Sequence, residues 1–198
     1  MPKQIRQNED INIAPDILGV YRENQYFAYD QKNDILLNPS NIDDKIVIYE
    51  RQVKEWFLNR ASYYLRGNKN GFVVLMICMS YFEGVEEFRN LDDNITNSNQ
   101  LFKQSIKRLY PEFSNTNITK LYNEARSGLF HLGMVRKRII INNTYELAIW
   151  FENRNNIKIN PRKLLIDIKK DFKSYLKDLR NVNNIELRAK FDSKFTVI

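Results

Sequence analysis

Apolar residues recur about every 3.6 positions between Ile42 and Tyr64, and polar residues fill the places between them. This period predicts an amphipathic helix, and Gly67 marks its end. The next run, residues 72–82, is apolar on all sides and continues to Phe88. A helix that is apolar all round belongs at the centre of a bundle, so we expect this run to form a central helix.

The same period predicts further helices downstream. A short helix carries Phe102, Ile106 and Leu109 on one face, and the next helix begins at Asn117. A last long helix is expected at about residues 161–181, where an Asn-Pro pair supplies the N-cap and the first helical residue.

Between these last two helices the apolar period changes to two, which predicts a small antiparallel meander at about residues 136–159. Residues 1–40 show no sustained period, and we expect an N-terminal arm that packs on something else. Within it, residues 26–29 and 35–37 are candidates for two short strands around a turn at residues 31–34. The predicted fold is therefore mainly α. It is a four- to five-helix bundle over residues 41–198, with a small antiparallel β appendage before the last long helix.

Composition removes several classes of site. The 198 residues include one cysteine, Cys78, and one histidine, His131, which excludes an internal disulfide and any zinc site built on cysteines or a histidine cluster. A metal site of carboxylates alone stays open, although no spacing recommends it. Neither a dinucleotide-binding fingerprint nor a P-loop occurs. We expect no cofactor and no metal.

Charge indicates the kind of partner. Lys and Arg number 31 against 24 Asp and Glu, a formal charge of +7, which favours a polyanion and nucleic acid before an acidic membrane. An ordinary basic surface explains the same excess equally well. The apolar run is too short for a membrane span, and the first twenty residues lack a signal-peptide pattern, so we expect a cytoplasmic protein.

The candidate chemistry lies on the helix that begins at Asn117. On an ideal helical wheel, Arg126, Ser127 and His131 share the polar arc. The opposite arc is an apolar stripe that should face the core, formed by Ile118, Tyr122, Ala125, Leu129 and Leu132. A guanidinium binds a phosphate through a planar fork, and an imidazole transfers protons near neutral pH. Together they suit phosphodiester chemistry, in which the 2′-hydroxyl of RNA acts as nucleophile without a metal.

One histidine per chain is too few for both an acid and a base. Arg126 and His131 also lie about 140° and about 7.5 Å of rise apart on a straight helix, so a single helix does not direct both at one phosphate. A two-fold dimer that joins two copies of this helix would supply two arginines and two histidines in one cleft. The sequence therefore favours a homodimer.

The segment from Arg126 to His131, Arg-Ser-Gly-Leu-Phe-His, matches the Arg-x(4–6)-His motif of the HEPN superfamily of helical ribonucleases and nucleotide-binding domains. The wider run of residues 124–134 resembles a plasmid- and phage-defence-associated HEPN family, in which a hairpin and an Asn-Pro-initiated helix follow the motif. The resemblance covers roughly residues 44–182.

The resemblance implies a metal-independent endoribonuclease with a composite dimer site, which serves as a toxin or an antiviral-defence effector. Its partners would be RNA and a cognate antitoxin or another defence protein. Arg126 and His131 carry over as the catalytic pair, while Ser127 stands where many members have Asn, Asp or His. Glu83 is a supporting candidate that could approach Arg126 from a neighbouring helix, or an ordinary carboxylate at a helix end.

Other positions have plainer readings. Arg136, Lys137 and Arg138 directly follow the motif and are candidates for RNA binding. The last long helix interleaves lysines with aspartates, including Asp171, which we interpret as a solvated face. Cys78 lies in the apolar run and is interpreted as a buried, inert thiol.

Two alternatives to the nuclease remain. One is a non-catalytic HEPN-like module that binds RNA, a nucleotide or a partner protein. The other is a helical scaffold in a mobile-element complex. Whether Arg126 and His131 face an accessible surface separates the first reading from the rest.

Overall fold

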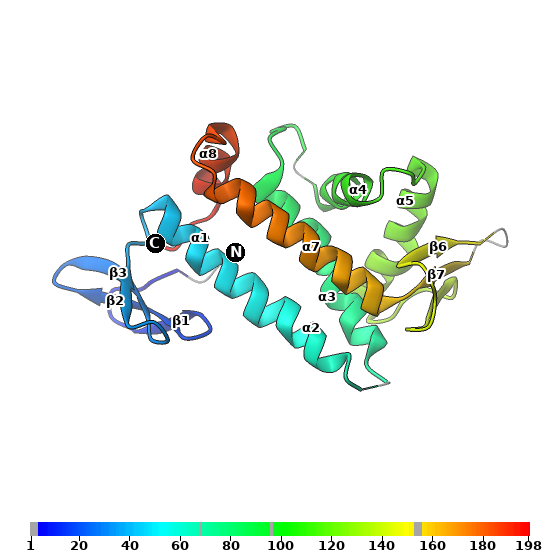
Figure 1. The fold of residues 1–198 in the computed structure, drawn as a ribbon, viewed down its shortest axis with the longest axis horizontal. Helices are drawn as coiled ribbons and strands as arrows, with labels where there is room; N and C mark the ends of the chain where they lie inside the picture. Colours follow the sequence, from blue (N-terminus) through cyan, green and yellow to red (C-terminus); the bar gives the residue numbers. More distant parts are fainter. Residues whose placement is uncertain (1–3, 68, 96, 153–155) are drawn as a thin grey trace. The chain divides into compact units, whose positions relative to one another are not determined.

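The computed structural model describes residues 4–67, 69–95, 97–152 and 156–198 (Figure 1). These residues form six continuous helical segments, a four-stranded sheet and a three-stranded sheet. They fall into two compact units: Met1–Arg60 with Ser174–Ile198, and Ala61–Lys173. The fold is mixed α and β, so the prediction of a mainly helical bundle with a minor β appendage is wrong.

The largest departure lies in the N-terminal unit, where the expected arm forms an antiparallel sheet. Its strands, in spatial order, are β1 (Ile11–Ala14), β2 (Ile17–Arg22), β3 (Gln25–Asp30) and β4 (Ile35–Leu37). The turns use non-glycine residues at positive φ: Asp16, then Glu23 and Asn24 in the β2–β3 hairpin, then Asp34. Such turns usually carry glycine, and none of these does. The short strands indicated at residues 26–29 and 35–37 correspond to β3 and β4, whereas the sequence reading did not find β1 and β2.

Helices complete this unit. The chain continues through α1 (Ile42–Arg51), the π-helical segment η1 (Gln52–Leu58) and α2 (Asn59–Tyr64), within which it enters the second unit. After the second unit it returns within α7 (Pro161–Arg180) and ends with α8 (Ile185–Lys194). Tyr49 of α1 packs edge-on against Tyr175, Phe191 and Phe195, which form the aromatic core of this unit.

The second unit is built on α3 (Gly71–Arg89), the helix from the apolar run. It is followed by α4 (Ser98–Leu109), α5 (Asn115–Leu121), the π-helical η2 (Tyr122–Arg126) and α6 (Ser127–Leu132). Val74, Leu75, Met79 and Phe82 of α3 are completely buried. Cys78 is buried among them, as expected of an inert thiol, and burial raises the pKa of its sulfhydryl.

The three-stranded sheet of this unit is mixed, and the expected antiparallel meander is wrong. The strands β5 (Ile139–Ile141), β6 (Ile149–Phe151) and β7 (Ile157–Ile159) lie in the order β5-β7-β6. The last strand in the sequence runs parallel to β5 and antiparallel to β6. Ile157 and Ile159 have no exposed surface, and the central place in the sheet covers them from both sides.

The last long helix, α7, begins where the Asn-Pro pair indicated. The Asn160 side chain accepts hydrogen bonds from the backbone amides of Arg162 and Lys163, at 3.0 and 3.1 Å, and Pro161 occupies the first helical position. No helix among the described residues is both long enough and apolar enough to cross a membrane.

Candidate functional site

The helix that carries the motif departs from the ideal wheel at the motif itself. Ser114, rather than Asn117, caps α5, because its hydroxyl accepts the backbone amide of Asn117 at 3.2 Å. The chain then takes a π-helical turn at Tyr122–Arg126 before α6. Such a turn holds one residue more than an α-turn, and it occurs often at functional sites.

Arg126, the last residue of the π-helical turn, is directed inward. Its side chain is 14% exposed, whereas the wheel placed it opposite the core, and Leu132, expected in the core stripe, is 66% exposed. Ile118, Ala125 and Leu129 are buried, so these three residues of the predicted apolar stripe lie in the core as expected.

Glu83 of α3 faces Arg126 across the unit. The arginine donates from Nε to Oε1 and from Nη2 to Oε2, the second bond measuring 2.6 Å. The Glu83 side chain is 16% exposed, so both partners are largely withdrawn from water. The hydrogen bond to Glu83 raises the pKa of Arg126, although burial opposes the rise. Of the two readings left open for Glu83, the geometry matches the one that pairs it with Arg126.

Two aromatic rings lie close to this guanidinium. Its central carbon lies 4.9 Å from the ring centroid of Phe130 and 5.5 Å from that of Tyr122. Its third nitrogen, Nη1, has no hydrogen-bond partner among the residues that the structure describes. The arginine is thus fixed along one edge of its plane and retains a donor on the other.

His131 lies in the last turn of α6 and is exposed. Gly133, at φ +69°, ends the helix in the left-handed conformation that glycine adopts readily. Within the described ranges, no hydrogen bond or ion pair joins His131 to Arg126. Phe130, Leu132 and Met134, which are close to His131 in the sequence, are also exposed.

The basic segment is attached to the back of the motif helix. The Arg136 backbone amide donates to the Glu124 carbonyl at 2.9 Å, and a Cβ on Gly128 would lie 2.7 Å from the Met134 carbonyl oxygen. Only a glycine permits so close an approach. Arg136, Lys137 and Arg138 have exposed side chains, and Ser127 is half-buried beside Arg126. The structure therefore places all the candidates on or next to one helix, with only Arg126 and Glu83 in contact.

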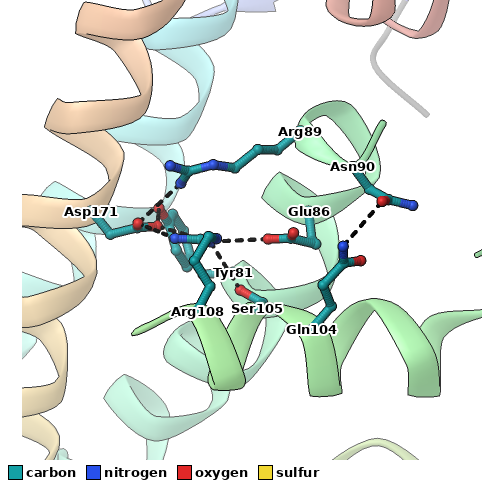
Figure 2. Close-up of polar contacts among 8 residues, drawn as sticks. All are labelled: Tyr81, Glu86, Arg89, Asn90, Gln104, Ser105, Arg108 and Asp171. Carbon is teal, nitrogen blue, oxygen red and sulfur yellow. Dashed lines mark hydrogen bonds and ion pairs between the residues drawn. The ribbon is translucent and has the colours of Figure 1, made fainter. Parts of the chain in front are cut away.

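A polar network that the sequence reading missed holds α3 in place (Figure 2). Asp171 of α7 accepts hydrogen bonds from the Tyr81 hydroxyl at 2.7 Å, from Arg89 at 3.0 Å and from Arg108 of α4. Arg108 also donates to Glu86 at 2.9 Å. Two carboxylates and two guanidiniums balance in charge and connect three helices. Glu86 follows Glu83 by nearly one turn of α3, so the network also fixes the helix that presents Glu83 to Arg126.

Asp171 is buried, and its assignment to a solvated face is wrong. The sequence contained a usable signal, because Ile168, Phe172 and Tyr175 share a helix face with position 171 at i, i+3, i+4 and i+7 spacing. An aspartate within an apolar stripe indicates a buried partner of opposite charge.

No group of three or more histidine, cysteine, aspartate or glutamate side chains in the described ranges is arranged to hold a metal ion. Comparison of the chain with protein-family models, curated proteins and solved structures gives no match.

Proposed function

We propose that the protein is a metal-independent endoribonuclease of HEPN type, which acts as a homodimer in a toxin or antiviral-defence role. The observation that carries this proposal is the setting of Arg126. Glu83 and two aromatic rings hold its guanidinium, and Nη1 has no hydrogen-bond partner in the described part of the chain. The same helix bears an exposed histidine. A fixed guanidinium with one open edge suits a phosphate, because the side chain is already oriented and loses little further conformational entropy when the phosphate binds.

In the proposed reaction, His131 of one protomer removes the proton from the RNA 2′-hydroxyl. The 2′-oxygen forms a bond to phosphorus while the bond to the 5′-oxygen breaks, and His131 of the second copy protonates that leaving oxygen. Arg126 stabilises the charge that develops on the phosphoryl oxygens. The products are a 2′,3′-cyclic phosphate and a 5′-hydroxyl, so no water, metal or cofactor is consumed.

Three exposed apolar residues close to His131 in the sequence support the dimer. Phe130, Leu132 and Met134 would gain from burial against a second copy, and such a contact would bring two histidines together. Arg136, Lys137 and Arg138 would then approach the cleft from both protomers and contact RNA phosphates.

The second candidate function is a non-catalytic module that binds RNA, a nucleotide or a partner protein. The ion pair with Glu83 favours it, because a carboxylate already neutralises Arg126 and lessens its attraction for phosphate. The two functions differ in one outcome, whether RNA is cut.

The deciding experiment follows a labelled RNA in excess EDTA with wild type, His131→Ala and Arg126→Ala. We expect cleavage by the wild type with cyclic-phosphate ends, survival of DNA of the same sequence, and a loss of about 10²–10⁴ in rate for His131→Ala at nearly unchanged RNA affinity. Arg126→Ala should lower both rate and affinity. RNA binding without cleavage would support the second candidate, and cleavage that EDTA abolishes would refute both the mechanism and the assignment of its residues.

The dimer has its own test. Leu132→Asp should shift sedimentation at micromolar concentration from dimer to monomer and reduce cleavage, whereas Val182→Asp, at a residue equally exposed on another part of the chain, should change neither. A wild-type monomer with full activity would refute the composite site.

A further inference from the structure

The free edge of β6 offers unpaired backbone groups. Ala148 accepts the Asn160 amide at 2.9 Å and Glu152 donates to Asn156 at 2.9 Å, so the even-numbered residues of this strand face β7. In an antiparallel ladder the alternate residues face the other way, which directs the N–H and C=O groups of Ile149 and Phe151 outward. Neither residue makes a further backbone hydrogen bond among the described residues.

A hollow of about 630 Å³ lies against this edge. Its walls come from residues 146–151, from the connection after α4, from Asn117 of α5 and from the first turns of α7. The apolar lining includes Leu147, Phe151, Phe113 and Ile166. Phe113 meets the Phe151 ring edge-on at 5.1 Å and stacks on Tyr110 at 5.1 Å, and the Tyr110 hydroxyl donates to Asp167 at 3.0 Å. The walls are therefore braced against one another.

We propose that this edge and hollow form a docking site for an extended peptide segment of a partner protein. The segment adds as a fourth strand beside β6, pairs with the backbone of Ile149 and Phe151, and inserts one apolar side chain into the hollow. The unpaired groups indicate that the occupant is extended, since another extended backbone can pair with a row of backbone donors and acceptors. The aromatic and aliphatic lining indicates that the occupant carries an apolar side chain that fits the hollow.

The charges around the hollow argue against a nucleotide or RNA strand in the same place. Glu112, Glu146 and Asp167 contribute three carboxylates, against Lys163 and Lys170. Lys163 is already engaged by the Glu146 carbonyl oxygen. A phosphate would meet more negative than positive charge here, whereas a neutral peptide backbone would not.

A second copy of the chain fits less well than a separate segment. Symmetric pairing of two β6 strands would satisfy the edge, but Ile149 is already buried in its own protomer and Phe151 is committed to Phe113. Neither could fill the hollow of the other copy. Leu147 and Trp150 are exposed on the same segment, but they already line the hollow of their own protomer. The occupant therefore brings a free apolar side chain of its own.

The test starts from a phage-displayed library of random short peptides selected on the wild-type protein, followed by titration of synthetic peptides made from the enriched sequences. We expect alternating apolar positions in the enriched peptides. Methylation of the amide nitrogens that face β6 should abolish binding, and methylation of the intervening amides should not. Amide exchange at Ile149 and Phe151 should slow when the peptide is bound.

Two matched variants locate the site. Ile166→Asp places a charge on the wall of the hollow at a residue that is 46% exposed, so folding should survive, and peptide affinity should fall about tenfold or more. Val182→Asp, at a residue 68% exposed and outside the hollow, should bind as the wild type does. No enrichment, binding by helical peptides only, unchanged affinity in Ile166→Asp, or displacement of the peptide by RNA would each overturn the proposal. None of these outcomes depends on whether the protein cuts RNA.

Discussion

Removal of the Glu83 carboxylate is the most informative single perturbation of the candidate site. Breaking a fully buried ion pair costs about 3–5 kcal/mol, and an exposed pair is worth about 0.2–1 kcal/mol. The side chains of Glu83 and Arg126 are 16% and 14% exposed, which places this pair nearer the buried limit. We therefore expect Glu83→Ala to lower the free energy of unfolding by about 2–3 kcal/mol.

Double-mutant cycles in urea separate this pair from general effects of truncation. The cycle of Glu83→Ala with Arg126→Ala should give a coupling energy of about 2 kcal/mol. The Arg6–Glu9 pair, with side chains 72% and 60% exposed, provides the matched control, whose coupling should stay below about 1 kcal/mol. Equal coupling in the two cycles would show that Glu83 does not hold Arg126, and the geometric basis of the proposed site would be lost.

The pH dependence of the coupling follows from the sign of the pKa shift. The folded-state pKa of Arg126 is raised by its hydrogen bond to Glu83, so the arginine's contribution to stability is fully present below its unfolded pKa, which lies far above neutral pH. This contribution is lost only as the pH rises through the folded-state pKa. The arginine should therefore introduce no variation of the coupling energy between about pH 6 and pH 9.

Three further predictions concern the framework around the site. Gly128→Ala should lower the free energy of unfolding by about 1–3 kcal/mol, because the new Cβ would lie 2.7 Å from the Met134 carbonyl oxygen. Gly84→Ala, in open space on α3, should raise the free energy of unfolding by about 0.4–1 kcal/mol, and equal shifts of the two denaturation curves would contradict this explanation. Asp171→Ala should lower the free energy of unfolding by about 3–5 kcal/mol, because among the described residues Arg108 would keep only Glu86 as a charged partner. A loss below about 1 kcal/mol would show the network to be solvated. Cys78 should react with a thiol reagent only after the protein unfolds, and rapid reaction of the native protein would show that the centre of α3 opens.

The sequence by itself determined where several elements begin and what they contain. The apolar run that became α3 and the Asn-Pro start of α7 are local patterns, and each acts through its own period or cap. The residue types of the candidate chemistry were also visible, since a single histidine five positions after an arginine needs no structure to be noticed.

Tertiary structure decided which segments pair with which. The first four strands are short and turn through Asp16, Glu23, Asn24 and Asp34, so the sheet depends on backbone pairing that no local period records. Strand β7 took the central place between β5 and β6 because that place buries Ile157 and Ile159 on both sides. The gain from burial there belongs to the assembled sheet, not to any one strand.

The same division applies to the site. An ideal wheel could not foresee the inward place of Arg126, because the wheel assumes a regular α-helix and the chain takes a π-helical turn at Tyr122–Arg126. Glu83 and Arg126 lie 43 positions apart, and Asp171 reaches Arg108 over 63. Charge pairs at such separations leave no periodic trace in the sequence, because burial, which decides whether a charge needs a partner, is a property of the folded chain.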